Sequence, residues 1–457
     1  MYGVCSGRLR YQNGLLLLAS YIFYGSWNWK FLFLLWFSTM VDFVAGRKIE
    51  ACGPGNLSGK RFWLWLSVAI NLGLLGFFKY FHFFAHNAVG LLSLLGLQVT
   101  IPPFFQNIIL PVGISFYTFQ TMCYTIDVYR GRIRAEHDFL SFSLYVSFFP
   151  QLVAGPIERA GALLPQITHP RTLTRENFLL GARFFLFGCF KKLVIGDNAG
   201  VFVDRVFRDL SAATPWEILF LLHAFWVQVY CDFSGYSDMA VGSAKILGFS
   251  LTENFNSPFF SSTVGEFWRR WHISLSSWLR DYLYVPLVSG RGRRLWIRGG
   301  GLLITFALCG LWHGANWTFV VWGVYNGLLM MVELLFKIKA SSVRWVRGVQ
   351  ILLTLHLLLI GMCLFRSPSL REAFLVLKKA GMLFSREGWV YFSPMEVAKL
   401  VIISFVPITL LEFLEAKTKY FERRWPIGLQ ISMYLSWLYA ISFFKVGDGE
   451  LFMYFQF

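Results

Sequence analysis

Charged residues are scarce in this chain of 457 residues. Asp, Glu, Lys and Arg make up 15% of it, where soluble proteins carry about 25%. Hydrophobic residues make up 56%, and apolar runs such as 31–37 and 351–360 are typical of segments that lie in lipid. No long polar region remains that could form a second, soluble domain. The composition therefore predicts a polytopic membrane protein with a single membrane-embedded domain over residues 1–457.

Acidic residues are few as well. The chain has 25 Asp and Glu residues and 42 Lys and Arg residues, which gives a formal net charge of +17. The basic residues fall mainly in short loops between apolar runs, as expected of cytoplasmic loops near anionic lipid headgroups. No basic folded module is present that could carry nucleic acid, so we expect membrane lipid and no nucleic acid as a partner.

The motifs of several familiar chemistries are absent. The seven cysteines have no short paired spacing, which argues against a disulfide framework and against a metal site. The chain has no nucleophile elbow, no phosphate-binding glycine loop and no zinc-ligand pair. We therefore expect no metal and no permanently bound cofactor, and a reaction that requires no serine, cysteine or lysine nucleophile.

Helical spans are predicted at the longer apolar runs. Two segments depart from this pattern. Residues 111–130 are too polar for lipid and should face protein or a cavity, while residues 230–240, with two acids among small residues, suit a broken or re-entrant helix. The predicted spans are residues 15–27, 31–44, 62–79, 178–195, 216–229, 302–311, 317–335, 351–364, 397–414 and 431–444.

Between residues 252 and 317, two histidines stand among tryptophan, glycine and aliphatic residues. A titratable side chain is costly to keep in hydrocarbon, so its presence is a functional hypothesis by default. The spacing predicts a helix over 266–283, with an aromatic side, a polar side that carries His272 and an end at Pro286. His272 then takes part in the chemistry, or it is an interfacial histidine that is hydrogen-bonded to a loop.

His313 is the more specific of the two. Gly310 and Gly314 flank it at a spacing that lets helices approach closely, and their missing side chains leave room for a thin substrate chain. Burial disfavours the charged imidazole, so we expect His313 to be neutral and able to act as a general base toward a hydroxyl. The alternative is a helix-packing motif whose histidine bonds to a neighbouring helix.

Acyl transfer fits this inventory, because a thioester donor is already activated and a polarised hydroxyl can attack it directly. Asn316, Ser274 or backbone N–H groups could stabilise the oxyanion, and the sequence does not choose among them. Four acids could hold a histidine, line a polar path or pair with a nearby base: Asp127, Asp232, Asp238 and Glu253. His223 and His356 are interpreted as lone core histidines.

Six motifs in the order of the chain resemble the membrane-bound O-acyltransferase (MBOAT) family, and within it the bacterial branch that acts on alginate and teichoic acid. They are LPVGISFYTFQ (110–120), FPQLVAGP (149–156), DFSGYSD (232–238), EFWRRWHISLS (266–276), GLWHGAN (310–316) and FMYFQF (452–457).

The resemblance implies an all-α fold: a ring of about ten or eleven transmembrane helices, with re-entrant and interfacial helices, around a thin core pierced by a tunnel. It implies that His313 is the catalytic histidine and His272 the second polar position of the site. A cytoplasmic acyl donor, acetyl-CoA or a carrier-bound thioester, would meet an extracytoplasmic polysaccharide or partner protein in a bacterial inner membrane. As supporting or substrate-binding residues we expect Trp312, Asn316, Ser276, Arg280, Asp281 and Asp232.

The leading hypothesis is thus an O-acyltransferase, with acetyl as the transferred group and an exported polysaccharide as the acceptor. D-alanyl transfer to teichoic acid is the alternative within the family. A transporter whose histidines relay protons would predict inverted repeats, and the sequence shows none. A purely structural scaffold would predict that neither histidine matters.

Overall fold

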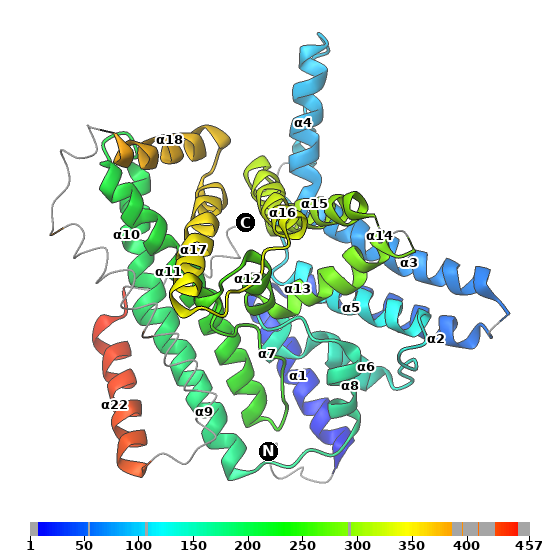
Figure 1. The fold of residues 1–457 in the computed structure, drawn as a ribbon. Coiled ribbons are helices and arrows are strands. Elements are labelled where there is room, and N and C mark those ends of the chain that lie inside the picture. The colour runs from blue at the N-terminus through cyan, green and yellow to red at the C-terminus, as the bar shows by residue number, and fades with distance from the viewer. Residues whose placement is uncertain are drawn as a thin grey trace. The chain divides into compact units, whose positions relative to one another are not determined.

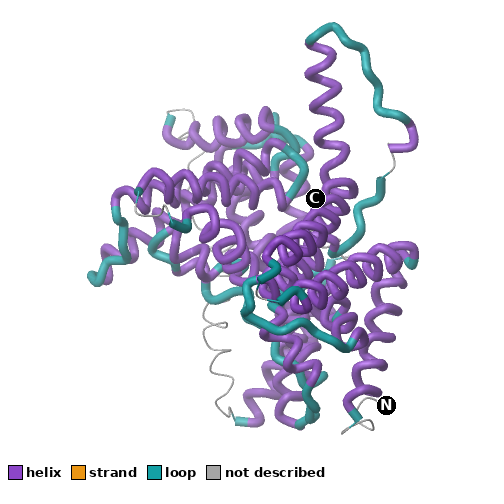
Figure 2. Tube along the Cα trace, turned by 90° about the vertical axis from the view of Figure 1, so that its right-hand side faces the viewer, coloured by secondary structure: helices purple, strands orange, loops and turns teal. Residues whose placement is uncertain are grey.

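The structure is a computed structural model that describes residues 8–53, 55–105, 108–290, 294–385, 395, 410 and 426–446. Over this part of the chain it consists of helices and loops, without a strand, as Figure 2 shows. The predicted all-α fold is therefore confirmed. The predicted span 397–414, apart from residue 410, and the motif at 452–457 lie outside the described residues.

The chain divides into two compact units that alternate along the sequence: residues 1–182 with 240–252, and residues 183–239 with 253–457. The helices α9 (Arg175–Phe190) and α11 (Pro215–Ile246) contribute residues to both units (Figure 1). The first unit contains α1 (Leu9–Asn28), α2 (Lys30–Ala51), α3 (Leu57–Leu75), η1 (Gly76–Tyr80), α4 (Phe81–Leu94), η2 (Pro103–Phe105), α5 (Ile114–Tyr129), α6 (Phe139–Ser147), α7 (Phe149–Leu152) and α8 (Ala160–Thr168).

The described helices of the second unit follow in chain order. They are η3 (Lys191–Gly196), α10 (Asp197–Arg208), η4 (Pro258–Phe260), α12 (Val264–Arg270), α13 (Ile273–Leu279), η5 (Arg280–Tyr284), α14 (Val285–Val288), α15 (Leu295–His313), α16 (Trp317–Phe336), α17 (Arg344–Arg366), α18 (Leu370–Gly381), η6 (Met382–Phe384) and α22 (Ile427–Phe444).

Among the described residues, five helical stretches are long and apolar enough to cross a membrane: 57–94, 215–246, 295–313, 317–336 and 344–366. Each contains or overlaps one of the predicted spans, which supports a multi-pass membrane protein. The total of ten or eleven spans stays a prediction.

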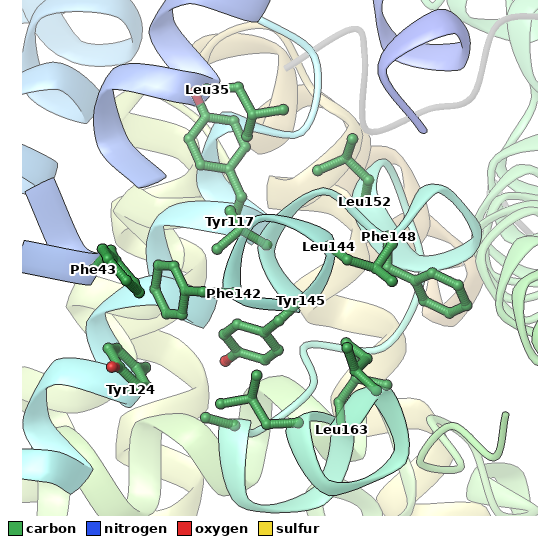
Figure 3. Packing of buried hydrophobic residues seen from close by; sticks show 14 of the residues in the cluster. Leu35, Phe43, Tyr117, Tyr124, Phe142, Leu144, Tyr145, Phe148, Leu152 and Leu163 are labelled. Atoms are coloured by element: carbon green, nitrogen blue, oxygen red, sulfur yellow. The ribbon is translucent and has the colours of Figure 1, made fainter. Parts of the chain in front are cut away.

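Aromatic and aliphatic side chains from α2, α5, α6 and α8 form the core of the first unit (Figure 3). Phe142 and Tyr145 of α6 are fully buried there, and the ring of Phe142 lies 4.6 Å from that of Tyr124 in α5. The polar side chains of α5 face protein, as expected: Gln120 is 3% exposed, and its Nε2 donates to the Tyr145 carbonyl at 2.6 Å. The Tyr145 carbonyl thus takes the place of water as the hydrogen-bond partner of Gln120, because lipid supplies no such partner.

The prediction of a broken helix at 230–240 is wrong, because α11 runs through this segment without interruption. Its two acids are paired: Asp232 lies 2.6 Å from Lys192 Nζ, and Asp238 lies 2.5 Å from Lys191 Nζ. A side chain added at Gly188 would overlap the backbone of Gly235, so the two backbones touch at this crossing. The close approach lets η3 supply the countercharges, and the helix therefore needs no break to satisfy its acids.

Helices α15 and α16 pack with their backbones in contact, as the glycine spacing around His313 predicts. A side chain added at Gly310 would overlap the carbonyl oxygen of Phe319, and one added at Gly323 would overlap that of Phe306. This reciprocal fit fixes the end of α15 against the start of α16.

Replacing Gly310 by Ala tests this packing. The added methyl group meets rigid backbone, and overpacking of this kind costs about 1–3 kcal/mol. We expect a lower midpoint for thermal loss of the monodisperse protein in detergent, measured by size-exclusion chromatography after heating. Gly300→Ala in the same helix is the matched control, since its new side chain meets open space. Equal midpoints for the two variants would contradict the packing.

Candidate active site

His272 lies at a break between two helices of the second unit. Helix α12 ends at Arg270, α13 begins at Ile273, and His272 has φ 42° and ψ 55°. This left-handed conformation is uncommon for a residue with a side chain and persists where the surroundings enforce it. The predicted continuous helix over 266–283 is therefore interrupted at residues 271–272, although Glu266 and Arg270 pair at 2.7 Å within α12.

A neighbouring loop explains the break. The Ile273 N–H donates to the Asn254 carbonyl at 2.9 Å, and the Asn256 N–H donates to the Arg270 carbonyl at 2.9 Å. These backbone groups would otherwise pair within a helix, so the loop takes the place of the missing helical turn.

The predicted end of the helix at Pro286 is also wrong. After α13 the chain forms the wider turn η5 and continues as α14 to Val288. The Val285 N–H donates to the Arg280 carbonyl within this turn. A single wide turn often occurs where the regular hydrogen-bond pattern of a helix is interrupted. Pro286 causes such an interruption, because it lacks an N–H.

The His272 side chain is buried and hydrogen-bonded. It is 1% exposed, its Nδ1 lies 3.1 Å from Asn254 Oδ1, and its ring stands edge-on to Phe233 at 4.5 Å. Burial lowers the pKa of His272 well below its usual 6.5, and the nearby His313 lowers it further. His272 is therefore a neutral imidazole at physiological pH.

His313 is the last residue of α15 and is 4% exposed. Its ring lies 5.1 Å from Trp312, 5.2 Å from Trp322 in α16 and 5.3 Å from Phe365 in α17. Helix α16 packs on α15, on α17 and on α12 (Figure 1). Aromatic rings thus enclose the imidazole, and the enclosure keeps the local dielectric low.

The Trp312 ring lies close to both histidines. Its ring centroid lies 6.2 Å from that of His272 and 5.1 Å from that of His313. The predicted pair of histidines and the predicted tryptophan therefore meet in one place.

The glycines beside His313 have a different role from one of those predicted. A side chain added at Gly314 would overlap the Phe319 ring, and the space beside Gly310 is filled by the Phe319 backbone. These glycines serve helix packing. They do not leave room for a substrate chain.

The two side chains considered for the oxyanion already donate elsewhere. Asn316 caps α16, where its Oδ1 accepts from the Thr318 N–H at 3.0 Å and its Nδ2 donates to the Pro368 carbonyl at 2.9 Å. Ser274 Oγ donates to Asn254 Oδ1 at 2.9 Å. The choice of the oxyanion donor among Asn316, Ser274 and backbone N–H groups stays a prediction.

The other predicted supporting residues have partners of their own. Ser276 Oγ donates to the Trp271 carbonyl at 3.1 Å and so helps to close the helix break. Arg280 and Asp281 form an ion pair with each other at 2.7 Å. Asp232 pairs with Lys192.

Sequence reasoning missed two features. Asn254, the partner of His272, stands 18 positions earlier in the chain, and the available signal was a polar residue in an aromatic-rich loop. His223 and His356 are not lone residues, because their rings lie 5.9 Å apart between α11 and α17. No cluster of three or more His, Cys, Asp or Glu side chains with the geometry of a metal site occurs among the described residues.

Comparisons with known proteins identify the family of the chain. Residues 130–339, which include both histidines, match the model of the MBOAT, membrane-bound O-acyltransferase family. The chain is 41% identical over 364 residues to the probable alginate O-acetylase AlgI of Pseudomonas aeruginosa. The matched region covers 80% of this chain and 68% of that protein. It is 35% identical over 393 residues to the peptidoglycan O-acetyltransferase of Helicobacter pylori, which covers 79% of this chain and 72% of that protein.

A teichoic acid D-alanyltransferase of Bacillus subtilis is more distant, at 29% identity over 283 residues, or 58% of this chain and 70% of that protein. With two buried histidines around a shared tryptophan and these relatives along most of its length, the chain belongs to the membrane-bound O-acyltransferase family and is a multi-pass membrane O-acyltransferase.

Proposed function

We propose that the protein transfers an acetyl group from a cytoplasmic thioester to a hydroxyl of an extracytoplasmic polysaccharide, or of a protein that carries the group there. The observation that carries the proposal is the burial of His272 and His313, whose rings both lie close to Trp312. The names of the relatives from Pseudomonas aeruginosa and Helicobacter pylori, which concern alginate and peptidoglycan, support acetyl and a polysaccharide. Both organisms are bacteria, which supports the bacterial cytoplasmic membrane as the location.

In the proposed reaction, neutral His313 accepts the proton of the acceptor hydroxyl as its oxygen attacks the thioester carbonyl. The tetrahedral intermediate then collapses: the carbon–sulfur bond breaks, the ester remains on the acceptor, and the thiolate leaves and takes up the proton from the imidazolium. The aromatic enclosure of His313 excludes water, which limits hydrolysis of the thioester and strengthens hydrogen bonds to the developing oxyanion. No covalent acyl-enzyme is needed.

His272 supports this step as a neutral, oriented imidazole. Two charged imidazoles so close together in an apolar enclosure would repel each other, so the pair carries at most one positive charge during turnover.

The acyl donor is proposed to be acetyl-CoA or an acyl group on a carrier protein, used as a substrate. The excess of basic over acidic residues favours approach of an anionic donor such as CoA from the cytoplasm. Extracytoplasmic proteins are proposed to hand the group on to the polymer.

His313→Ala should abolish polysaccharide acetylation while the protein inserts normally, because the proposed base is lost. The measurement is the acetyl content of surface polysaccharide by mass spectrometry, in cells that lack the natural protein and express each variant at equal level. His169→Ala, at an exposed histidine outside the site, is the matched control and should acetylate normally. Unchanged acetylation in His313→Ala would rule out the base assignment. A loss of D-alanine from teichoic acid would favour the other reaction of the family.

His272→Ala should also cause a large loss of acetylation in the same assay. A fall of less than about tenfold, or about 1.4 kcal/mol, would place His272 in a supporting role only.

The pH dependence tests the state of His272. A histidine whose pKa is lowered stays neutral as the pH falls through 6.5, so the activity that depends on it is kept there and is lost only at lower pH. We expect protonation of His272 to contribute no acid limb to kcat/KM of the protein in liposomes between pH 8 and 6.5. An acid limb in this range that disappears in His272→Ala would contradict this expectation.

A further inference from the structure

We infer that Asn254 is a positioning residue of the acyltransferase: its side chain holds His272 as the tautomer with the proton on Nδ1, so that Nε2 is the basic nitrogen. The inference rests on the proposed role of the two histidines and adds the residue that prepares one of them. Nothing in the relatives' names assigns a role to Asn254.

The orientation of the Asn254 amide follows from its neighbours. The Ser274 backbone N–H, which can only donate, points to Asn254 Oδ1 at 3.2 Å, and the Ser274 hydroxyl lies 2.9 Å from the same oxygen. On the other side, Asn254 Nδ2 donates to Ser237 Oγ of α11 at 3.2 Å. The amide is held at both ends, so Oδ1 is the atom that faces His272.

This orientation determines the tautomer of His272. A carbonyl oxygen only accepts, so the Nδ1 that lies 3.1 Å from it must carry the proton. A neutral imidazole has one N–H group, and the lone pair is then on Nε2. The same logic orients catalytic histidines in which a partner on one ring nitrogen prepares the other for proton transfer.

The backbone around His272 depends on the same residue through a separate contact. The Asn254 carbonyl accepts from the Ile273 N–H at 2.9 Å, beside the left-handed His272. Asn254 therefore contacts three consecutive residues, two with its side chain and one with its main chain. A substitution of Asn254 removes the side-chain contacts and keeps the main-chain contact, which allows the tautomer effect to be separated from the folding of the loop.

The test uses the full-length protein purified into liposomes, with acetyl transfer from acetyl-CoA as the readout. Asn254→Ala should lower kcat by about tenfold or more and leave KM for the donor unchanged, since a positioned acid–base group contributes about 10²–10⁴-fold. Asn177→Ala, at a partly exposed asparagine of α9 outside the site, is the matched control and should keep the wild-type kcat. A kcat within about twofold of the wild type in Asn254→Ala would overturn the inference.

The conservative variant supplies a readout that a purely structural role would not move. In Asn254→Asp a carboxylate still accepts from Nδ1, so much of the activity should return. Its negative charge stabilises the imidazolium, so the acid limb of the pH profile should move to higher pH. If Asn254→Asp is active with an unmoved acid limb, the contact to His272 is not the cause. This variant also decides the matter if Asn254→Ala fails to fold.

A double-mutant cycle completes the test. In the His272→Ala background, Asn254→Ala should cause no further loss, because its effect passes through the missing imidazole. Additive losses would assign Asn254 a role apart from His272. His313→Ala separates the two hypotheses: if that variant is active, the proposed function fails, whereas an inactive His313→Ala beside a fully active Asn254→Ala refutes only the role of Asn254.

Discussion

The site depends on the hydrogen bonds between the loop at 254–256 and the residues on either side of His272. They pair the backbone groups that the break between α12 and α13 exposes, and they hold a left-handed residue in place. An unpaired backbone group in such apolar surroundings costs about several kcal/mol. The loop thus stabilises the bend between α12 and α13, where the His272 imidazole lies among aromatic rings.

The aromatic residues around His313 are the counterpart of that loop. Trp312, Trp322 and Phe365 come from three helices, and the glycine contacts of α15 with α16 bring two of those helices to the required distance. The backbones of α15 and α16 touch at Gly310. Three aromatic rings then surround the imidazole at the end of α15. The same turns of α15 and α16 therefore provide the helix packing and the surroundings of the proposed base, His313.

Several predictions failed because of long-range partners. A helix over 266–283 follows from the local pattern, and the loop that interrupts it lies outside that window. A broken helix at 230–240 follows from its two acids, and the lysines that neutralise them belong to η3. Asn316 and Ser274, both candidates for the oxyanion, already donate to groups that the local pattern does not contain, the Pro368 carbonyl and Asn254. In each case the deciding group is close in space and distant in the chain.

The sequence by itself determined the class of the protein and its two histidines, because hydropathy and the presence of titratable groups in apolar segments are properties of composition and local order. It also indicated the close packing of α15 on α16 through the spacing of Gly310 and Gly314. Only the tertiary structure decided which side chain contacts His272 Nδ1, that the Trp312 ring lies near both imidazoles, and that Asp232 pairs with Lys192 and Arg280 with Asp281. The physical reason is that hydrogen bonds, ion pairs and ring contacts depend on distances between segments, which no local pattern contains.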